Sequence, residues 1–158
     1  MERQFTRQAE NALKLATTIA KSCGHGYIGT EHLLAGLLKE PEGTAGKVLQ
    51  EFNVEEEKLR ELISSLVTPV QGNTAAAETK DPQYSPRARR IIEQAKEDAE
   101  SMECLCGTEH LLLSLLKETD CVATRLLFTM GVNIQKLFVA ILTAMGFDND
   151  TIAEEFQY

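Results

Sequence analysis

Two short segments of the sequence hold the residues whose types could do chemistry, and the segments share one pattern. Glutamate followed by histidine occurs at Glu31-His32 and again at Glu109-His110, each time directly after Gly-Thr. A helix that binds zinc through His-Glu-x-x-His needs two histidines four residues apart, so that both imidazoles lie on one face. Neither segment has that spacing. We therefore predict that both histidines are structural and that neither segment holds a metal or catalyses a reaction.

The cysteines are the other candidates for chemistry, and they are Cys23, Cys104, Cys106 and Cys121. Cys104 and Cys106 lack the two-residue gap and the second cysteine pair of a zinc site. The sequence opens on a polar segment, so we expect reduced thiols in a cytoplasmic protein. It has no Gly-x-x-x-x-Gly-Lys-Ser/Thr loop for nucleotide phosphates and no serine-nucleophile signature. We predict that the chain uses no metal or cofactor and is not an enzyme.

The two glutamates have a structural explanation and a functional one, and the residues alone leave both open. A carboxylate in the first turn of a helix gains roughly 0.3–1 kcal/mol from the helix dipole. The same carboxylate could instead accept hydrogen bonds from a ligand. Thr30 and Thr108 precede Glu31 and Glu109, and we expect these threonines to be N-caps.

The two segments belong to an internal repeat, which decides the architecture. Residues 29–40 read GTEHLLAGLLKE and residues 107–118 read GTEHLLLSLLKE, so ten of the twelve positions are identical at an offset of 78. Upstream the offset is 79 and aligns Phe5 with Tyr84. Each copy is small, roughly 60 to 70 residues, and would struggle to bury its apolar faces alone. We therefore expect the two copies to pack together around one interior.

Each copy predicts four helices, and the first two have clear start signals. The first helix begins after Thr6 in one copy and after Ser85 in the other, because both hydroxyls can cap a helix. Pro86 fits the first helical position, where its missing N–H costs nothing. The second helix follows Thr30 or Thr108 and is short and strongly apolar.

The third and fourth helices complete each copy. The third is predicted near residues 44–52 and 122–130, with Gly131 as a C-terminal stop. The fourth is predicted to follow Asn53 or Asn133. No stretch alternates as a half-buried strand does. The fold class is therefore all-α, with two tandem four-helix repeats packed as a pseudo-two-fold bundle.

Composition sets the expected boundaries along the chain. We assign residues 1–67 to the first repeat, 68–83 to an exposed linker, 84–146 to the second repeat and 147–158 to a C-terminal tail. The linker contains prolines, a glycine and a run of small residues, a composition typical of connections. The tail is acidic and could form one more turn.

The charge of the chain restricts the class of its partner. Twenty-four acidic and sixteen basic side chains give a formal net charge of −8. That sign opposes docking on nucleic acid or on an anionic membrane surface, where phosphate contacts dominate affinity. No apolar run approaches the roughly 20 residues that cross a bilayer. We expect a protein or peptide partner, not nucleic acid and not a membrane.

The repeated motif also resembles a known family. Both copies contain Gly-Thr-Glu-His-Leu-Leu, and they open on Phe-Thr at residues 5–6 and on Tyr-Ser-Pro-Arg-Ala at residues 84–88. This combination resembles the Clp N-terminal repeat across residues 3–146 and is most similar to the ClpC-type AAA+ unfoldases. The resemblance implies a domain of a hexameric ATP-driven unfoldase that receives substrates and adaptor proteins and passes them to the ATPase modules. The alternative is a freestanding adaptor or regulator of the same fold that docks on an unfoldase in trans.

The resemblance further implies a ligand and its residues. ClpC domains of Gram-positive bacteria bind phosphoarginine, a degradation mark, in two pockets related by the repeat, so phosphoarginine-tagged substrate proteins are expected partners. A carboxylate can accept the N–H groups of the guanidinium-derived plane in a bidentate contact, and a helix N-terminus attracts the phosphate. An arginine from the first helix of each copy could assist the phosphate. The candidate ligand-binding residues are Glu31, Glu109, Thr30, Thr108, Arg7 and Arg87.

The two copies differ next to these residues. The first reads Gly-His-Gly-Tyr-Ile at residues 24–28, whereas the second reads Glu-Cys-Leu-Cys at residues 103–106 and is one residue shorter. We therefore expect Glu109 to be a weaker candidate than Glu31. Phe5 and Tyr84 occupy equivalent positions in the two copies, either as hydrophobic staples beside the N-caps or as an exposed pair for protein docking.

Overall fold

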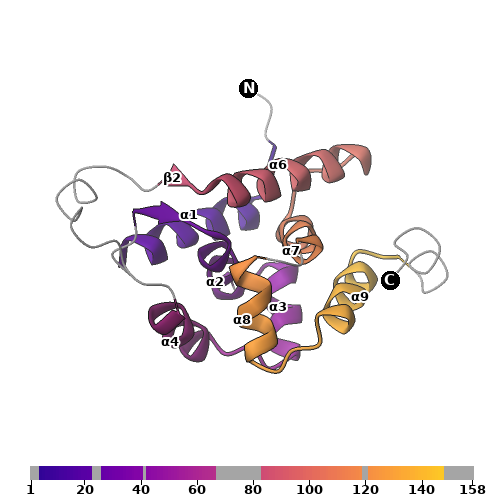
Figure 1. The fold of residues 1–158 in the computed structure, drawn as a ribbon. Coiled ribbons are helices and arrows are strands. Elements are labelled where there is room, and N and C mark those ends of the chain that lie inside the picture. Colours follow the sequence, from indigo (N-terminus) through magenta and orange to yellow (C-terminus); the bar gives the residue numbers. More distant parts are fainter. Residues whose placement is uncertain (1–3, 23–25, 41, 67–82, 119–120, 148–158) are drawn as a thin grey trace.

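The computed structural model describes residues 4–22, 26–40, 42–66, 83–118 and 121–147. It confirms the all-α fold, with four helices in each copy over these residues (Figure 1). The first copy contains α1 (Arg7–Ser22), α2 (Thr30–Lys39), α3 (Thr44–Glu51) and α4 (Glu56–Leu66). The second contains α6 (Pro86–Ser101), α7 (Thr108–Lys117), α8 (Val122–Thr129) and α9 (Ile134–Ala144). The predicted linker and tail lie outside the described residues, except for Gln83 and Phe147.

The first helix of each copy starts where the sequence predicted. The Thr6 hydroxyl accepts a hydrogen bond from the Ala9 N–H at 3.1 Å, which caps α1. In the second copy the Ser85 hydroxyl accepts from the Ala88 N–H at 3.2 Å, and Pro86 is the first residue of α6. These caps are local, so the sequence alone was enough to find them.

The end of the third helix holds one confirmed prediction and one error. Gly131 has a φ of 83° directly after α8, as its predicted stop role requires. Asn53 occupies the equivalent place after α3 with a φ of 62°, a conformation that asparagine tolerates better than most residues. Asn53 therefore ends α3 and does not start the fourth helix, which begins at Glu56. The Asn133 side chain does cap α9, since it accepts from the Lys136 N–H at 3.1 Å.

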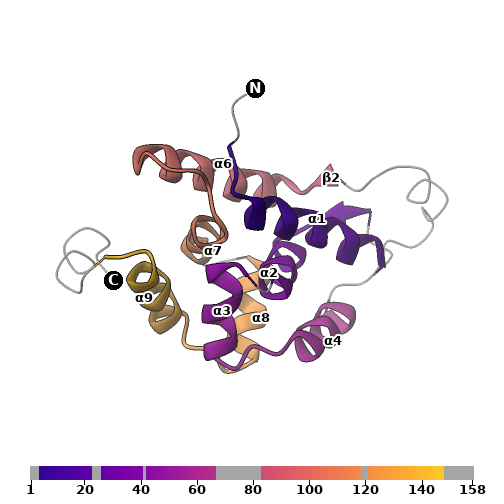
Figure 2. The ribbon, with the colours of Figure 1, turned by 180° about the vertical axis from the view of Figure 1, so that it is seen from behind.

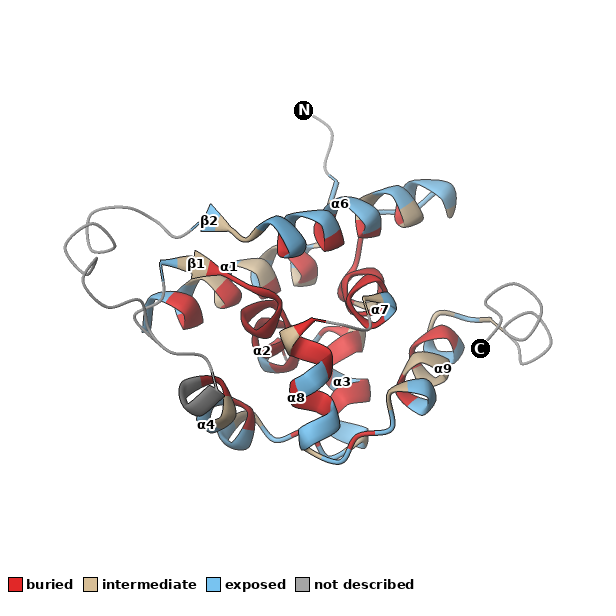
Figure 3. Ribbon diagram, in the orientation of Figure 1, coloured by how far each residue is buried: buried red, intermediate tan, exposed pale blue. Residues whose placement is uncertain are grey.

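The two Gly-Thr-Glu-His helices, α2 and α7, form the centre of the molecule. Every residue of α2 from Thr30 to Leu38 is buried, and α7 is nearly as enclosed (Figure 3). Gly36 lets α1 and α2 approach closely, because a Cβ there would collide with the Ala12 carbonyl oxygen. The second copy has Ser114 at this position, and its hydroxyl donates to the Ile91 carbonyl oxygen at 2.8 Å. A helix enclosed on all sides explains why both segments are apolar around their whole circumference.

The two copies interlock instead of packing as separate units. Helix α8 of the second copy packs on α2 and α4 of the first, and α3 of the first packs on α7 and α9 of the second. Helices α4 and α9 lie on opposite sides of α3 and α8 (Figures 1 and 2). The interior is therefore shared, as the small size of each copy predicted.

A short parallel pairing of extended segments also joins the copies. Strand β1 (Tyr27–Ile28) pairs with β2 (Gln83–Tyr84), and Phe5 forms the equivalent bridge with Cys106. In each case the segment before the first helix of one copy pairs with the segment before the Gly-Thr-Glu-His helix of the other. The sequence did not predict these strands, because two residues are too few to show an alternating pattern.

Candidate ligand-binding site

The Gly-Thr-Glu-His turn has the same geometry in both copies. Gly29 is the N-cap of α2, and its N–H donates to His32 Nδ1 at 2.8 Å. Gly107 is the N-cap of α7, and its N–H donates to His110 Nδ1 at 2.9 Å. Each histidine thus satisfies the N-terminus of its own helix from a buried position. This confirms the predicted structural role of the two histidines.

Thr30 and Thr108 do not cap their own helices, which corrects the sequence-based prediction. The Thr30 hydroxyl accepts from the Ala123 N–H in α8, and the Thr108 hydroxyl accepts from the Ala45 N–H in α3, both at 3.2 Å. The two alanines are the second residues of their helices, where a backbone N–H has no partner within the helix. Each threonine therefore caps the third helix of the other copy. Both side chains are buried at the interface between the copies.

The glutamate that follows each threonine folds back over the glycine N-cap. A Cβ added at Gly29 would collide with Glu31 Oε1, and one at Gly107 would collide with Glu109 Oε1. At both positions the glutamate carboxylate occupies the space in which a side chain of the N-cap residue would begin. Each carboxylate is thus held at the start of a buried helix, beside the positive end of its dipole.

The two carboxylates differ in their access to solvent. Glu31 is only 2% exposed, and the Tyr27 hydroxyl donates to its Oε2 at 3.2 Å. The Tyr27 ring also packs edge-on against His32, with 5.5 Å between ring centroids. Glu109 is half-buried, and the residue equivalent to Tyr27 is Leu105, which is 41% exposed and has no hydrogen-bonding group. Of the two predicted ligand contacts, Glu109 is therefore the more accessible.

The strand pairing decides which first helix begins beside which Gly-Thr-Glu-His segment. The Ser85 N–H donates to the Ile28 carbonyl oxygen at 2.9 Å, so the start of α6, which carries Arg87, lies beside the segment that leads to Glu31. The Thr6 N–H donates to the Cys106 carbonyl oxygen at 3.0 Å, so the start of α1, with Arg7, lies beside the segment that leads to Glu109. Both arginines are exposed. The segment before each Gly-Thr-Glu-His helix thus lies beside the start of the first helix of the other copy.

Arg7 also borders a cavity of about 360 Å³ between α1 and the segment that follows α2. Glu40 is buried at its edge and accepts hydrogen bonds from the Asn11 side chain and from the Glu42 N–H. The cavity brings two cations and several carboxylates together, so a zwitterionic ligand suits its charge pattern. Its lining residues are Arg7, Gln8, Glu10, Asn11, Lys14, Glu40 and Glu42.

Phe5 and Tyr84 are half-buried rings that pack against the core within the paired segments. Burial raises the pKa of the Tyr84 hydroxyl, so it stays protonated at neutral pH. The Lys96 Nζ lies 6.0 Å from the centroid of the Phe5 ring. Both rings therefore pack against the core and remain partly exposed.

The cysteines near Glu109 are weak nucleophiles. Burial raises the pKa of Cys106 to about 12, and the nearby Glu109 carboxylate adds to this effect. Burial and Glu109 also raise the pKa of Cys104, whose Sγ lies 3.5 Å from His110 Nε2. Burial lowers the pKa of His110. Among the described residues, no three His, Cys, Asp or Glu side chains are arranged to hold a metal ion.

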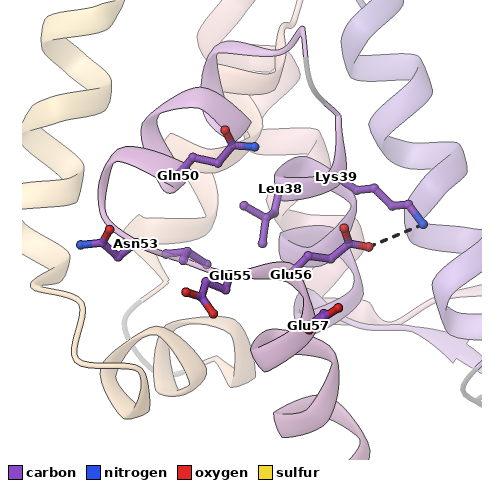
Figure 4. A pocket seen from close by; sticks show the side chains of 8 residues that line it. Leu38, Lys39, Gln50, Asn53, Glu55, Glu56 and Glu57 are labelled. Atoms are coloured by element: carbon purple, nitrogen blue, oxygen red, sulfur yellow. Dashed lines mark ion pairs between the residues drawn. The ribbon is translucent and has the colours of Figure 1, made fainter.

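A cavity of about 440 Å³, which was not predicted from the sequence, lies between the C-terminal ends of α2 and α3 and the start of α4 (Figure 4). Three consecutive glutamates, Glu55, Glu56 and Glu57, border it, and Lys39 Nζ forms an ion pair with Glu56 at 3.6 Å. The run of glutamates was the available signal. The second copy has Asn-Ile-Gln at the equivalent positions, residues 133–135, so this acidic surface is not repeated.

A comparison with family models identifies the relatives of this repeat. The model of the Clp repeat (R) N-terminal domain matches residues 4–104. The chain belongs to this family. ClpC, the ATP-binding subunit of an ATP-dependent Clp protease in Staphylococcus aureus (strain USA300), is 38% identical over 144 residues. The alignment covers 90% of this Clp repeat chain but only 17% of the relative, so the chain corresponds to a small part of such proteins.

Solved structures share the fold of this Clp repeat domain. The N-terminal domain of ClpD from Arabidopsis thaliana has a TM-score of 0.75 and 27% identity, covering 91% of this chain and 96% of that one. The N-terminal domain of Hsp104 from Candida albicans has a TM-score of 0.73 at 17% identity, covering 92% and 93%. A complex of the ClpV N-domain with a VipB peptide has a TM-score of 0.64 at 22% identity, covering 89% and 88%.

The length and composition of the helices can be compared with those of a membrane-spanning helix. No helix among the described residues is by itself long and apolar enough to cross a bilayer. Helices α8 and α9 reach the required length and composition only as a pair, and the pair is bent by 108°.

Proposed function

We propose that this chain is a substrate- and adaptor-recognition domain of a ClpC-like unfoldase and that it binds phosphoarginine-tagged proteins at Glu31 and Glu109. The observation that supports this most directly is repeated in both copies. A glutamate lies at the start of a buried helix, and the segment before that helix pairs with the segment before the arginine-bearing first helix of the other copy. The carboxylate suits the guanidinium-derived plane of the ligand, and the arginine suits its phosphate.

Several further observations agree with a binding role. The family relationship to ClpC connects the chain to the N-terminal part of a protease ATPase subunit. A ClpV N-domain of the same fold was solved in complex with a VipB peptide, so this architecture can hold a protein segment. Phe5 and Tyr84 are two candidate contacts for an adaptor, because each ring is only half-buried.

The proposal can be tested by isothermal titration of the purified chain with phosphoarginine, with arginine and phosphoserine as control ligands. Glu31→Gln and Glu109→Gln keep the size of each side chain and remove its charge. We expect each substitution to weaken one site by roughly 10- to 100-fold, since a hydrogen bond to a charged group contributes about 1.5–3 kcal/mol. Glu57→Gln changes the net charge equally on the acidic cavity of the first copy and should leave binding unchanged.

The titration has a clear negative outcome. Wild-type protein that is folded by circular dichroism but binds phosphoarginine no better than arginine or phosphoserine would contradict phosphoarginine recognition. Equal losses in all three variants would show that net charge, and not the two candidate sites, governs binding.

A further inference from the structure

The two candidate sites are the same in backbone geometry but differ in one covering residue. In the first copy Tyr27 lies four residues before Glu31, and its hydroxyl donates to Glu31 Oε2 at 3.2 Å. In the second copy Leu105 occupies the same place before Glu109 and leaves that carboxylate half-buried. The glycine cap, the threonine and the histidine are shared, and Tyr27 is a differing residue that contacts the carboxylate directly.

We propose that Tyr27 covers the first site and holds it closed, so that the second site, at Glu109, is the one open to ligand. This inference rests on the proposed function for its ligand but not for its geometry. A guanidinium group can reach Glu31 only if its N–H groups replace the Tyr27 hydroxyl and the ring leaves its edge-on contact with His32. The two sites then offer the same groups to a ligand, but only the first must break a hydrogen bond of its carboxylate to Tyr27 before the ligand binds.

The surroundings of Tyr27 suit a side chain that opens without unfolding the domain. Its backbone is fixed by the pairing of β1 with β2, in which Tyr27 lies opposite Gln83. His32, under the ring, is held separately by the Gly29 N–H. Rotation of the Tyr27 side chain therefore uncovers Glu31 while the helix cap and the strand pairing stay in place. Leu105 offers Glu109 no such hydrogen bond.

The covering of Glu31 by Tyr27 can be tested without any ligand. The rate at which each carboxyl group is labelled by a water-soluble carbodiimide and glycinamide is measured by mass spectrometry. In the wild-type chain we expect Glu109 to be labelled at least tenfold faster than Glu31, since Glu31 is 2% exposed. Tyr27→Leu copies the second site and should bring Glu31 labelling to within about threefold of Glu109. The reciprocal Leu105→Tyr should slow labelling of Glu109. Tyr27→Phe keeps the ring and removes only the hydroxyl, so it replaces Tyr27→Leu in this test if that variant does not fold.

The consequence for binding is measured by phosphoarginine titration in a Glu109→Gln background, where only the first site remains. Tyr27→Leu should then strengthen binding about tenfold, because the ligand no longer competes with a hydrogen bond to a charged acceptor. Leu105→Tyr in a Glu31→Gln background should weaken binding by a similar factor.

The outcomes separate the two proposals. If the labelling rates of Glu31 and Glu109 change as expected in the Tyr27 and Leu105 variants, Tyr27 does cover Glu31. If phosphoarginine then binds neither site, only the proposed ligand is wrong. Equal labelling of Glu31 and Glu109 in the wild-type chain, or no response of Glu31 to either Tyr27 variant, overturns the cover whatever the titrations show.

Discussion

Replacing Thr108 by valine removes one hydroxyl and leaves the shape of the side chain almost unchanged. That hydroxyl accepts a hydrogen bond from the Ala45 N–H at 3.2 Å, although the two residues lie 63 positions apart in the sequence. Thr108 is only 1% exposed, so no solvent reaches the N–H after the substitution. The variant therefore leaves a donor at the start of α3 without a partner.

The cost follows from two independent estimates. Loss of an N-cap side chain destabilises a helix or protein by about 0.5–2 kcal/mol, and a buried donor left without an acceptor costs about 1–3 kcal/mol. We expect Thr108→Val to lower the free energy of unfolding by about 1.5 kcal/mol, or the melting temperature by about 3–6 °C. Thr30→Val should cost a similar amount, because its hydroxyl caps α8 through the Ala123 N–H.

Urea unfolding followed by circular dichroism measures this free energy through the midpoint and the slope. Thr18→Val is the matched control, since the Thr18 hydroxyl is exposed and donates to the Lys14 carbonyl oxygen within α1. It should change the unfolding free energy by no more than about 0.5 kcal/mol. The Thr108 variant should also unfold in a single transition, because the lost hydrogen bond joins the two copies.

Two results would refute this reasoning. A Thr108 variant as stable as the Thr18 control would show that the cap between the copies contributes nothing. Two separate transitions, with one copy unfolding before the other, would show that the copies do not share a cooperative interior.

Three further predictions follow from particular groups. Gly36→Ala should destabilise the domain by more than 1 kcal/mol in urea unfolding, roughly the range for overpacking, because a Cβ there collides with the α1 backbone; no loss would contradict the close approach. At pH 8 iodoacetamide should modify Cys104 slowly in the native protein and Cys106 only after unfolding, since the Cys106 pKa is about 12; fast native alkylation of Cys106 would be inconsistent with its burial. The pKa of the His110 imidazole, measured by NMR, should lie below 6.5. The unfolded chain then binds the proton at a higher pH than the native chain, so the contribution of His110 to stability is complete above about pH 6.5 and falls as the pH drops towards the native pKa. A native pKa above 6.5 would reverse this pH dependence.

The Gly-Thr-Glu-His turn shows where prediction from sequence reached its limit. The start of α2, the structural role of His32 and the same arrangement in α7 were predicted from the repeated motif, and the structure agrees. The role assigned to Thr30 was wrong, because a hydroxyl at a helix start can cap its own helix or another one. The choice depends on which N–H lies within reach, and that N–H belongs to a residue 93 positions away.

For the candidate sites, too, some features could be predicted from the sequence and others could not. Glu31, Glu109, Arg7 and Arg87 were proposed from the family resemblance, but the sequence could not say which first helix begins beside which Gly-Thr-Glu-His segment. The pairing of Phe5 with Cys106 and of Tyr84 with Ile28 decides this, and it crosses between the copies. A two-residue strand has too few side chains to show its period, so only the assembled chain reveals it.

What the sequence determined by itself is therefore periodic or local: two copies of one helical repeat, the hydroxyl caps of α1 and α6, and the stop at Gly131. The caps and the stop depend on residues within about one helical turn of each other, and the repeat is visible as identical residues at an offset of 78. The tertiary structure alone decided the exchange of caps between the copies and the unequal exposure of Glu31 and Glu109. These features depend on groups that meet only when the two copies pack together, because neither copy can bury its apolar faces or satisfy its helix ends alone.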